Sequence, residues 1–351
     1  MKRIVHLIPY QAIGGVEVAA RSLPTGKHEE LFFERQYLVR PGDVTPEAGE
    51  YHGPTISLNH PRAYWHALRV LLRDPPDLLV ASLWRSALVL ISLRILRPRV
   101  RVVLFLHSTF DVHFLDRLIN KAAMKLCDAI WADSHMTLLR RVPHLLRGKG
   151  RVVSFLLDSH PLPAARPRPK PRFIFWGRLN AQKGLDRALS IFEAVARKQD
   201  DAVFMIVGPD GGMAATLRDR VNARGLTERV LFGGPMNHAE IFREAAFASF
   251  YLQTSPDEGM ALSVVEAMQA GLVPVVTPVG EIAHYCRDGE TAVFVREDMA
   301  AVDAVLALLA NPDRYRQMSL AAAQYWQAKP IYRNDFLAAA REAIGDRMHE
   351  T

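Results

Sequence analysis

Short apolar runs alternate with amphipathic segments along most of the chain. Runs of about four to nine apolar residues predict buried β-strands, and apolar positions spaced three and four apart predict helices. In the first half we expect strands at 3–8, 31–39, 55–58, 78–82, 101–106, 129–132 and 151–155, and helices at 61–73, 86–96 and 114–126. In the second half we expect strands at 173–176, 203–207, 230–232, 248–252, 273–277 and 292–295, and helices at 185–197, 213–224, 239–246, 262–269 and 300–309.

This alternation restarts once, which predicts two doubly wound α/β domains. Fully apolar strands joined by helices form parallel sheets covered on both faces. The segment between the two runs has prolines at 161, 163, 167, 169 and 171, which exclude a helix or an inner strand. We therefore expect an N-terminal domain at 1–160, a linker at 161–172, a C-terminal domain at 173–330 and a last helix at 331–351 that packs back on the first domain. Ligands of such sheets bind beyond the carboxyl ends of the strands.

Composition favours a soluble enzyme of one or two domains. The chain has 351 residues, of which 49% are hydrophobic and 23% are charged. Two cysteines are too few for a disulfide framework or a structural zinc site. No apolar run approaches the ~20 residues of a spanning helix, and the apolar start is too short for a signal peptide, so we expect a cytoplasmic protein.

Charge divides the chain into a basic and an acidic half. Residues 1–170 carry 25 Lys and Arg against 14 Asp and Glu, a net charge of +11. Residues 171–351 carry 19 against 23, a net charge of −4. This asymmetry indicates that the two halves bind different partners.

Several common nucleotide-binding motifs are missing from the sequence. It contains no Gly-x-Gly-x-x-Gly, no P-loop and no Asp-x-Asp. It does contain Gly14-Gly15 after the first predicted strand, where glycines let the backbone approach a ligand and a helix N-terminus offers N–H groups to an anion. An ordinary strand–helix turn is the alternative interpretation.

A loop in the second half carries two cations at a strand end. Arg178 and Lys183 lie in a segment that begins with Trp176-Gly177 and ends with Gly184. An arginine and a lysine in such a loop can converge on a diphosphate, the arginine through two parallel hydrogen bonds. Two solvated surface cations are the alternative.

Two carboxylates follow, eight residues apart. Glu258 lies in a loop at a strand end, and Glu266 lies two turns into the next predicted helix, among apolar neighbours. A carboxylate in an apolar stretch needs hydrogen-bond partners or a ligand. Both could accept hydrogen bonds from sugar hydroxyls; the alternatives are a buried ion pair for Glu266 and a solvated acid for Glu258.

His107 ends the predicted strand at 101–106 in the first half. This position turns it towards the expected ligand side of the sheet. A lone histidine at a strand end is more often structural than catalytic.

Taken together, these residues resemble glycosyltransferase family 4. The resemblance covers Gly14-Gly15, His107, the Arg178–Lys183 loop and the Glu258-x7-Glu266 block with Gly271 and Pro274 downstream. It implies a GT-B fold, in which two Rossmann-like domains face each other across a cleft, and a retaining transferase that uses a nucleotide sugar. It also implies no metal and no cofactor besides the nucleotide diphosphate sugar as co-substrate.

The resemblance also implies a role for each site residue. Arg178 and Lys183 would bind the donor diphosphate, Glu258 the donor sugar and Glu266 the ribose, while His107 would lie near the reacting sugar. Gly15 would let the first domain approach the phosphates or the acceptor. The backbone of Gly259, Met260, Ala261 and Leu262 would face the donor, although Met260-Ala261 stands where the family commonly has Phe-Gly.

The helix predicted at 61–73 carries a basic stripe. Arg62, Arg69 and Arg73 fall on one face, with His66 between them, beside an apolar stripe of Tyr64, Trp65, Leu68, Leu71 and Leu72. A basic amphipathic helix of this kind favours an anionic membrane surface. The alternative is a helix whose apolar stripe packs on the sheet while its arginines are solvated. No recognition helix or RNA-binding motif is present, so we expect no nucleic-acid partner.

The sequence thus predicts a hexosyltransferase peripheral to the inner face of the membrane. The donor would be a UDP-sugar, with GDP-mannose second, and the acceptor a lipid or lipid-linked saccharide. The alternatives are a transferase with a soluble acceptor, a sugar-nucleotide epimerase of the same fold and a non-catalytic membrane-surface scaffold. A dinucleotide oxidoreductase is disfavoured by the missing glycine motif.

Overall fold

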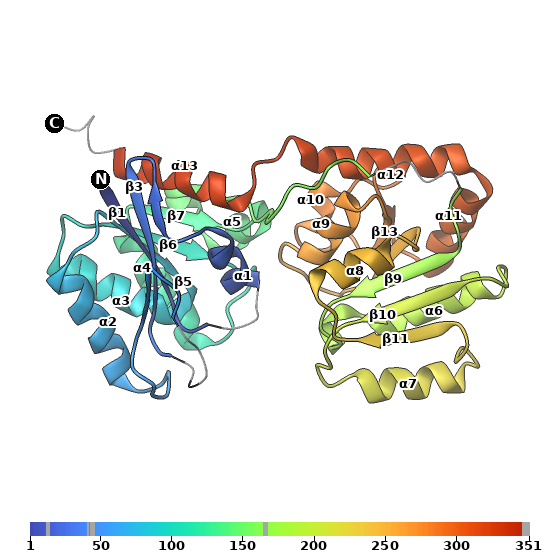
Figure 1. Ribbon diagram of the computed structural model, residues 1–351, viewed down its shortest axis with the longest axis horizontal. Helices are drawn as coiled ribbons and strands as arrows, with labels where there is room; N and C mark the ends of the chain where they lie inside the picture. Colours follow the sequence, from blue (N-terminus) through green and yellow to red (C-terminus); the bar gives the residue numbers. More distant parts are fainter. Residues whose placement is uncertain (12–14, 41, 43–45, 164–167, 346–351) are drawn as a thin grey trace. The chain divides into compact units, whose positions relative to one another are not determined.

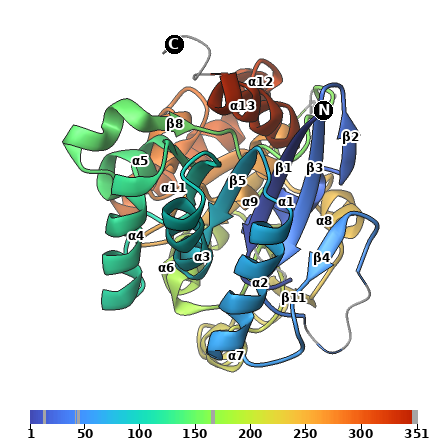
Figure 2. The same cartoon turned by 90° about the vertical axis from the view of Figure 1, so that its left-hand side faces the viewer.

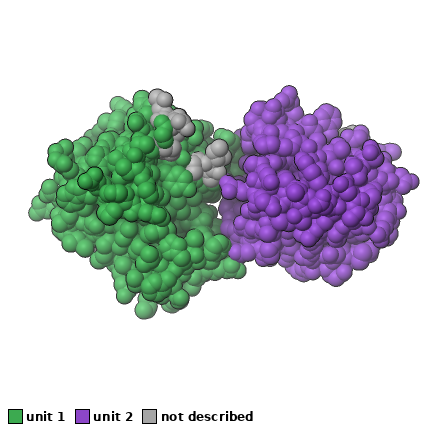
Figure 3. Space-filling model, turned by 90° about the horizontal axis from the view of Figure 1, so that it is seen from below, with its two compact units in different colours: residues 1–158, 330–351 green, residues 159–329 purple. Residues whose placement is uncertain are grey.

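The computed structural model describes residues 1–11, 15–40, 42, 46–163 and 168–345 (Figure 1). The chain divides into two compact units (Figure 3). Unit 1 combines Met1–Asp158 with Pro330–Thr351, and unit 2 is Ser159–Lys329. The chain therefore leaves unit 1, builds all of unit 2 and returns to unit 1. Within the described residues, no helix combines the length and the apolar character needed to cross a membrane.

Unit 1 is built on a sheet in the order β2-β3-β1-β5-β6-β7-β8, with β4 paired to β3. Among the strand pairs of the described residues, only β2–β3 is antiparallel. The strands are β1 (Lys2–Ile8), β2 (Gly26–His28), β3 (Leu31–Tyr37), β4 (Glu50–His52), β5 (Leu78–Ser82), β6 (Arg101–Leu106), β7 (Ala129–Ala132) and β8 (Gly150–Val152). The inner strands are buried on both faces, as expected for a parallel sheet between helical layers.

Helices cover this sheet on both sides. They are α1 (Gly15–Ser22), α2 (Pro61–Arg73), α3 (Leu83–Leu96), α4 (Phe114–Leu126), α5 (His135–Arg141), the 3₁₀ turn η1 (His144–Lys149) and α13 (Tyr332–Gly345). Helices α2, α3 and α4 lie side by side (Figure 2), over a core that includes Leu79, Leu93 and Met124. Helix α2 begins with a proline at its first position, after His60, whose imidazole accepts a hydrogen bond from the Arg62 amide.

The last helix, α13, is part of the core of unit 1. Phe336 is fully buried, and its ring centroid lies 5.1 Å from that of Trp131 and 5.5 Å from that of Phe33. The Asp335 carboxylate accepts hydrogen bonds from the Arg151 guanidinium at 2.9 Å and from the Ser154 amide at 2.7 Å. These contacts fix a segment that follows unit 2 in the sequence onto the sheet of unit 1.

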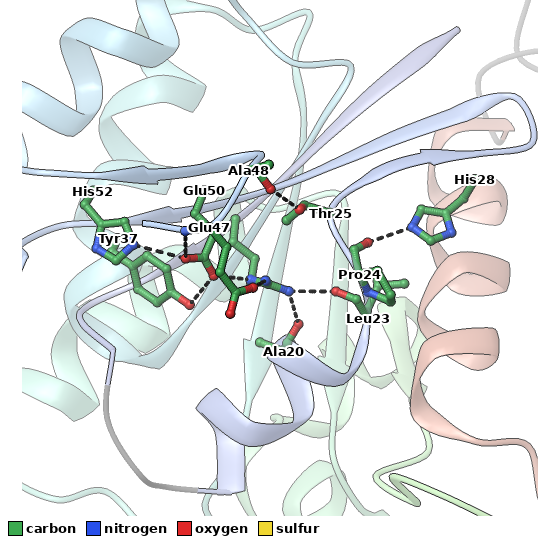
Figure 4. A network of polar contacts seen from close by, with 11 residues as sticks. Ala20, Leu23, Pro24, Thr25, His28, Tyr37, Glu47, Ala48, Glu50 and His52 are labelled. Carbon is green, nitrogen blue, oxygen red and sulfur yellow. Dashed lines mark hydrogen bonds and ion pairs between the residues drawn. The ribbon is translucent and has the colours of Figure 1, made fainter. Parts of the chain in front are cut away.

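A network of polar contacts, which includes Ala20, Leu23 and Glu50 (Figure 4), joins the end of α1 to β3 and β4 through a buried arginine. Arg35, on β3, is 1% exposed and donates to Glu50 at 2.9 Å and to the carbonyl oxygens of Ala20 and Leu23. Glu50 is equally buried and also binds His52. Because a buried charge is tolerated only with partners, this network fixes where α1 ends beside the sheet.

Unit 2 has a parallel sheet in the order β11-β10-β9-β12-β13-β14. Its strands are β9 (Arg172–Trp176), β10 (Val203–Val207), β11 (Val230–Gly234), β12 (Phe250–Gln253), β13 (Val273–Val276) and β14 (Val293–Phe294). Its helices are η2 (Ala181–Lys183), α6 (Leu185–Ala196), α7 (Ala214–Ala223), α8 (His238–Ala245), α9 (Leu262–Gln269), α10 (Ile282–Tyr285), α11 (Asp298–Ala310) and α12 (Pro312–Gln327). Helix α6 packs against α7 and α11, and α9 packs against α12 and β13. The α/β class with parallel sheets is confirmed.

Two expected strands in unit 1 differ substantially from the structure, whereas the ends of the other expected strands shift by two residues or fewer. The apolar run at 55–58 is not a strand; the edge next to β3 is occupied by Glu50–His52 instead. A short edge strand needs few apolar residues, so this one gives no apolar signal in the sequence. The last strand of the sheet ends at Val152 rather than at 155, and Phe155 turns away to pack on Tyr332 of α13.

Candidate functional site

The loop after β9 is held against the end of β12 by a glycine. Gly184 has φ of +62°, and a Cβ atom there would lie 2.0 Å from the Thr254 carbonyl oxygen. Only glycine fits such an approach. The Thr254 hydroxyl also donates to the Gly184 carbonyl at 2.6 Å. This contact places Lys183 beside the polar residues that follow β12.

Lys183 and Glu258 form an ion pair in which one carboxylate oxygen takes all the hydrogen bonds. The Lys183 ammonium is 2.7 Å from Oε1 of Glu258, which also accepts from Ser255 at 2.8 Å and from Gln253 at 3.0 Å. Glu258 is 5% exposed. Its Oε2 has no hydrogen bond to any residue that the structure describes. The carboxylate is therefore fixed through one oxygen and has the other available.

Arg178 is the unpaired cation of the same loop. Its side chain is exposed, and within the described ranges its guanidinium has no hydrogen bond or ion pair. The aliphatic part of the side chain lies along Gly211, where an added Cβ would be 2.7 Å from Cγ. Nearby, Asp210 already accepts from the amides of Gly212, Met213 and Ala214, and these bonds lower its carboxyl pKa. The Arg178 guanidinium thus retains all five of its N–H donors.

Glu266, on α9, contacts two ring nitrogens. Its Oε2 accepts from the Trp176 indole at 2.7 Å, and its Oε1 lies 3.2 Å from Nε2 of His238. The side chain is 21% exposed. Each carboxylate oxygen can accept two hydrogen bonds, so Glu266 has unused capacity on its exposed side.

A chain of hydrogen bonds joins the two carboxylates. Tyr251, fully buried on β12, donates to Gln253 at 2.7 Å and contacts the Trp176 carbonyl at 3.3 Å. Gln253 binds Glu258, and Trp176 binds Glu266. Burial raises the pKa of Tyr251 well above its usual value, so the phenol keeps its proton. Satisfied buried networks of this kind fix side-chain positions.

The turn between Glu258 and α9 presents free amides. The N–H groups of residues 259–263 donate no hydrogen bond to any residue in the described part of the chain. The turn is fixed from behind, because the Glu281 amide donates to the Gly259 carbonyl at 3.1 Å and the Tyr285 hydroxyl to the Met260 carbonyl at 3.0 Å. Free amides at a helix N-terminus form a surface suited to an anion.

Ala261 occupies a backbone conformation that favours glycine. Its φ is +53°, at the N-cap of α9. We expect Ala261→Gly to relieve this strain and to stabilise the protein by up to about 1 kcal/mol, seen as a higher urea midpoint. Ala270→Gly, at a residue with ordinary helical φ, is the matched control and should lower the midpoint. An unchanged or lower midpoint for Ala261→Gly would mean that the turn carries no strain.

The remaining predicted residues, Gly15 and His107, belong to unit 1. Gly15 is exposed and is the first residue of α1; Gly14 lies outside the described residues. His107 follows β6 directly, and its Nε2 is 2.8 Å from the Ser82 hydroxyl. Burial and the neighbouring His6 hold the pKa of His107 well below its usual value. His107 is therefore neutral at physiological pH.

Sequence reasoning missed the residues that hold the two carboxylates. Glu258 and Glu266 are connected or anchored by Trp176, Tyr251, Gln253 and His238. An aromatic residue in a strand is normally interpreted as part of the hydrophobic core, so Trp176 and Tyr251 did not stand out. One signal was available: Gln253, Thr254 and Ser255 form a polar run at the end of an apolar strand. Polar side chains at that edge of a parallel sheet indicate a site.

Comparisons with known proteins agree with this architecture. Residues 162–325 match the family model described as glycosyl transferases group 1. In fold, the chain is similar to sucrose-phosphate synthase from Thermosynechococcus elongatus, with a TM-score of 0.78 at 18% identity over 97% of this chain and 98% of the other.

Two of the relatives with similar sequences are mannosyltransferases by name. One is the GDP-mannose:cellobiosyl-diphosphopolyprenol alpha-mannosyltransferase of Xanthomonas campestris, 29% identical over 41% of this chain and 40% of the relative. The other is the phosphatidyl-myo-inositol mannosyltransferase of Mycobacterium leprae, 31% identical over 56% of this chain and 50% of the relative. The chain thus spans half or less of the length of these relatives. The protein has the GT-B fold, and its second unit matches the glycosyl transferases group 1 family.

Proposed function

We propose that the protein is a retaining glycosyltransferase that moves a hexose from a nucleotide diphosphate sugar to a lipid or lipid-linked saccharide. One observation carries the proposal: around one set of strand ends in unit 2, an arginine, five amides and one carboxylate oxygen have no hydrogen-bond partner among the described residues. Cations and amides suit a diphosphate, and carboxylate oxygens suit hydroxyl groups. The family match and the two relatives support the same class of reaction.

In this proposal the cations bind the diphosphate. Arg178 offers parallel N–H donors to two phosphate oxygens, and Lys183 adds a point charge while staying paired with Glu258. The amides of residues 259–263 add neutral donors. Negative charge develops on the diphosphate as the sugar leaves, so donors that are already fixed stabilise the transition state more than the ground state.

The carboxylates bind the sugars at either end of the diphosphate. Oε2 of Glu258 accepts from a hydroxyl of the transferred hexose, while Oε1 keeps its three anchors. Glu266 accepts from the ribose hydroxyls beside Trp176 and His238. Gly15, in unit 1, lets the backbone approach the phosphates or the acceptor. His107, in the same unit, lies near the reacting sugar.

Retention follows from transfer on one face of the sugar. The bond from the anomeric carbon to the phosphate oxygen breaks, and the bond to the acceptor oxygen forms on the same side. The acceptor proton passes to the departing phosphate. Arg178 and Lys183 supply the positive charge that this step needs, so we propose a reaction without a metal or a further cofactor. Activity that survives a chelator would support this proposal, and activity restored only by a divalent cation would contradict it.

The relatives' names support a choice of donor and of acceptor class. Both sequence relatives are mannosyltransferases, one of them specific by name for GDP-mannose, and both act on lipids or lipid-linked sugars. The matched segments include unit 2, which holds the proposed donor site. GDP-mannose is therefore the first donor to test and UDP-glucose the second.

A transferase with a lipid acceptor must bind at a membrane surface, and in this proposal it binds at the inner face. Arg62, Arg69 and Arg73 are exposed on α2, and Trp65 is 60% exposed beside them. Leu68 and Leu71 of the same helix pack on the sheet instead, so the apolar stripe is only partly available. Further exposed apolar side chains lie at the start of α4, close in sequence to His107: Phe110, Val112, Phe114, Leu115 and Leu118. Exposed apolar side chains next to cations suit an anionic membrane surface.

Vesicle binding tests the membrane proposal. Each arginine near an anionic surface contributes about 1 kcal/mol, so R62Q/R69Q/R73Q should bind anionic vesicles about 100-fold more weakly at low salt. The control is R243Q/R287Q/R316Q, three exposed arginines of unit 2, which should bind like the unchanged protein. Equal binding by both triple variants, or none by the unchanged protein, would contradict the proposal.

The experiment for the function as a whole is a thermal-shift panel of GDP, UDP, ADP, GDP-mannose and UDP-glucose. A ligand at 100 times its Kd stabilises the native state by about 2.7 kcal/mol. The donor that binds is then incubated with and without acceptor, and the products are analysed. A glycosylated acceptor supports a transferase, and conversion of the donor without acceptor points to an epimerase. Failure of every nucleotide to bind would overturn the proposal.

A further inference from the structure

Arg85 is a partly buried cation in the first turn of α3. It comes three residues after Ser82, the last residue of β5, so it lies at the edge of the unit 1 sheet where the parallel strands end and where ligands of such sheets bind. Across the ranges that the structure covers, no carboxylate pairs with its guanidinium. A partly desolvated charge without a counter-charge is costly, so this position favours an anion from outside the chain.

The place of Arg85 in its helix adds to this imbalance of charge. The N-terminus of a helix carries partial positive charge, which acidic side chains stabilise and basic side chains do not. Helix α3 has no acidic residue in its first turn, and the Ser82 side chain forms no capping hydrogen bond with it. Arg97 lies at the opposite end of α3, where the helix dipole favours a cation. Arg85 is thus the less stable of the two cations until an anion binds beside it.

Three contacts fix the guanidinium of Arg85 and leave one of its edges open. Nη1 donates to the Leu58 carbonyl at 3.0 Å and to the Tyr64 hydroxyl at 3.1 Å, and Cζ lies 4.5 Å from the centroid of the Trp84 ring. Nε and Nη2 form no hydrogen bond to the described residues and are not enclosed by them. These two nitrogens share one edge of the guanidinium, and their parallel N–H groups suit two oxygens of a phosphate.

The backbone that presents this side chain is strained. Leu83 has φ of +67°, a conformation that bulky side chains rarely adopt. Such strain is retained where the surrounding structure enforces it, and it clusters at functional positions. Here it sets the direction in which Trp84 and Arg85 leave the end of β5.

Exposed apolar side chains lie close to this arginine. The Trp84 ring, which supports the guanidinium, meets the His113 ring edge to face, with 4.9 Å between the centroids. His113 belongs to the 110–114 segment, in which the side chains of Phe110, Val112 and Phe114 are all more than half exposed. A cation and a set of exposed apolar side chains are therefore joined through two aromatic rings.

The 110–114 segment is held in place by buried polar groups. The Asp116 carboxylate, which is 4% exposed, accepts a hydrogen bond from the Val112 amide at 2.7 Å. The Arg141 guanidinium donates to the Phe110 carbonyl at 2.7 Å. The fold thus keeps these apolar side chains at the surface, where they suit an apolar ligand.

We propose that Arg85 binds the phosphate of the acceptor and that the 110–114 segment binds its hydrocarbon chain, so that the acceptor is a phosphate-bearing lipid. An anionic group next to a hydrocarbon chain matches a fixed cation next to exposed apolar side chains. In taking this lipid to be the acceptor, the inference rests on the proposed function. It distinguishes a lipid phosphate from a soluble, uncharged saccharide.

Farnesyl diphosphate is the probe that tests the site, titrated into the full chain by calorimetry in the presence of GDP. It should bind more tightly than inorganic pyrophosphate or farnesol, each of which has only one of the two recognised groups. Arg85→Gln should weaken its binding about 10- to 100-fold, the usual effect of losing hydrogen bonds to a charged group. Arg85→Lys, which keeps the charge, should weaken it less. Absence of binding, or equal affinity for pyrophosphate, would overturn the inference.

A second variant tests the hydrocarbon contact by itself. Phe114→Ser removes an exposed side chain and should weaken farnesyl diphosphate about 10-fold, because a buried phenyl ring no longer leaves water on binding. Its affinity for pyrophosphate should stay the same. Unchanged binding of farnesyl diphosphate by this variant would refute the contact with the chain of the lipid.

Arg147→Gln is the matched control for Arg85→Gln. Arg147 is also a partly buried arginine of unit 1, and its printed hydrogen bonds go to the Leu139 and Val142 carbonyls. Its loss should leave the affinity for farnesyl diphosphate unchanged. If Arg85→Gln also left it unchanged, Arg85 would only tether the chain at Leu58.

Two further measurements separate this site from the donor site and from bulk lipid. Arg178→Ala should weaken GDP and not farnesyl diphosphate; loss of both would place the probe in the donor site and overturn the inference. Arg85→Gln should bind anionic vesicles like the unchanged protein, and a matching loss of vesicle binding would assign Arg85 to bulk lipid instead. If no nucleotide binds, the proposed function fails, and the titration with farnesyl diphosphate still decides whether Arg85 binds a lipid phosphate.

Discussion

Arg178→Ala should reduce kcat by about 10²- to 10³-fold, the usual effect of removing one fixed donor from a developing negative charge. The guanidinium has no hydrogen bond or ion pair with the described residues, so its removal breaks no polar contact of the fold. We therefore expect an unchanged urea midpoint alongside the loss of turnover. Steady-state kinetics with the donor found in the thermal-shift panel measures the effect.

Two comparisons sharpen this experiment. Arg287→Ala removes an exposed arginine of unit 2 paired only with Glu290, and it should turn over normally. Lys183→Ala should lose both activity and stability, because it leaves the buried Glu258 carboxylate without its cation, a change that costs about 3–5 kcal/mol. Full activity of Arg178→Ala would show that the diphosphate binds elsewhere.

Gly184→Ala should destabilise the protein by about 3 kcal/mol or more, a large folding effect for one methyl group. The new Cβ would lie 2.0 Å from a backbone oxygen, that of Thr254, so the loop after β9 or the end of β12 must move. Either movement displaces Lys183 from Glu258. Urea unfolding followed by circular dichroism should show a lower midpoint, and donor binding should weaken as well.

Gly225 is the matched control for this substitution. Its φ of +65° is almost the same as that of Gly184, but a Cβ there would have no atom within 4 Å. Gly225→Ala therefore measures the cost of the left-handed backbone alone, about 1 kcal/mol. Similar midpoints for the two variants would mean that the contact with Thr254 is relieved without cost.

The fold class could be predicted because parallel sheets leave a strong pattern. Their inner strands are apolar on both faces, as at 78–82 and 203–207, and the helices between them are long enough to show their period. The edge strand β4 could not be predicted, since it has the polar sequence Glu-Tyr-His and is recognisable only through its pairing with β3.

The candidate site could be predicted at charged residues that the sequence places at the ends of strands. Lys183 and Glu258 lie 75 residues apart, and the sequence marks each as a charged group at a strand end; the ion pair between them appears only in the fold. Ser82 gave no signal at all, because a serine at the end of a strand is common. Its contacts with His6 on β1 and with His107 after β6 appear only in the fold.

The return of the chain to unit 1 has a consequence for biosynthesis. Tyr332 and Phe336 are almost completely enclosed in the first unit, yet the ribosome makes them after every residue of the second. Domains usually fold in the order in which they emerge. Here the second unit can finish folding during translation, while the first must wait, with an open hydrophobic face, until α13 has been released from the exit tunnel.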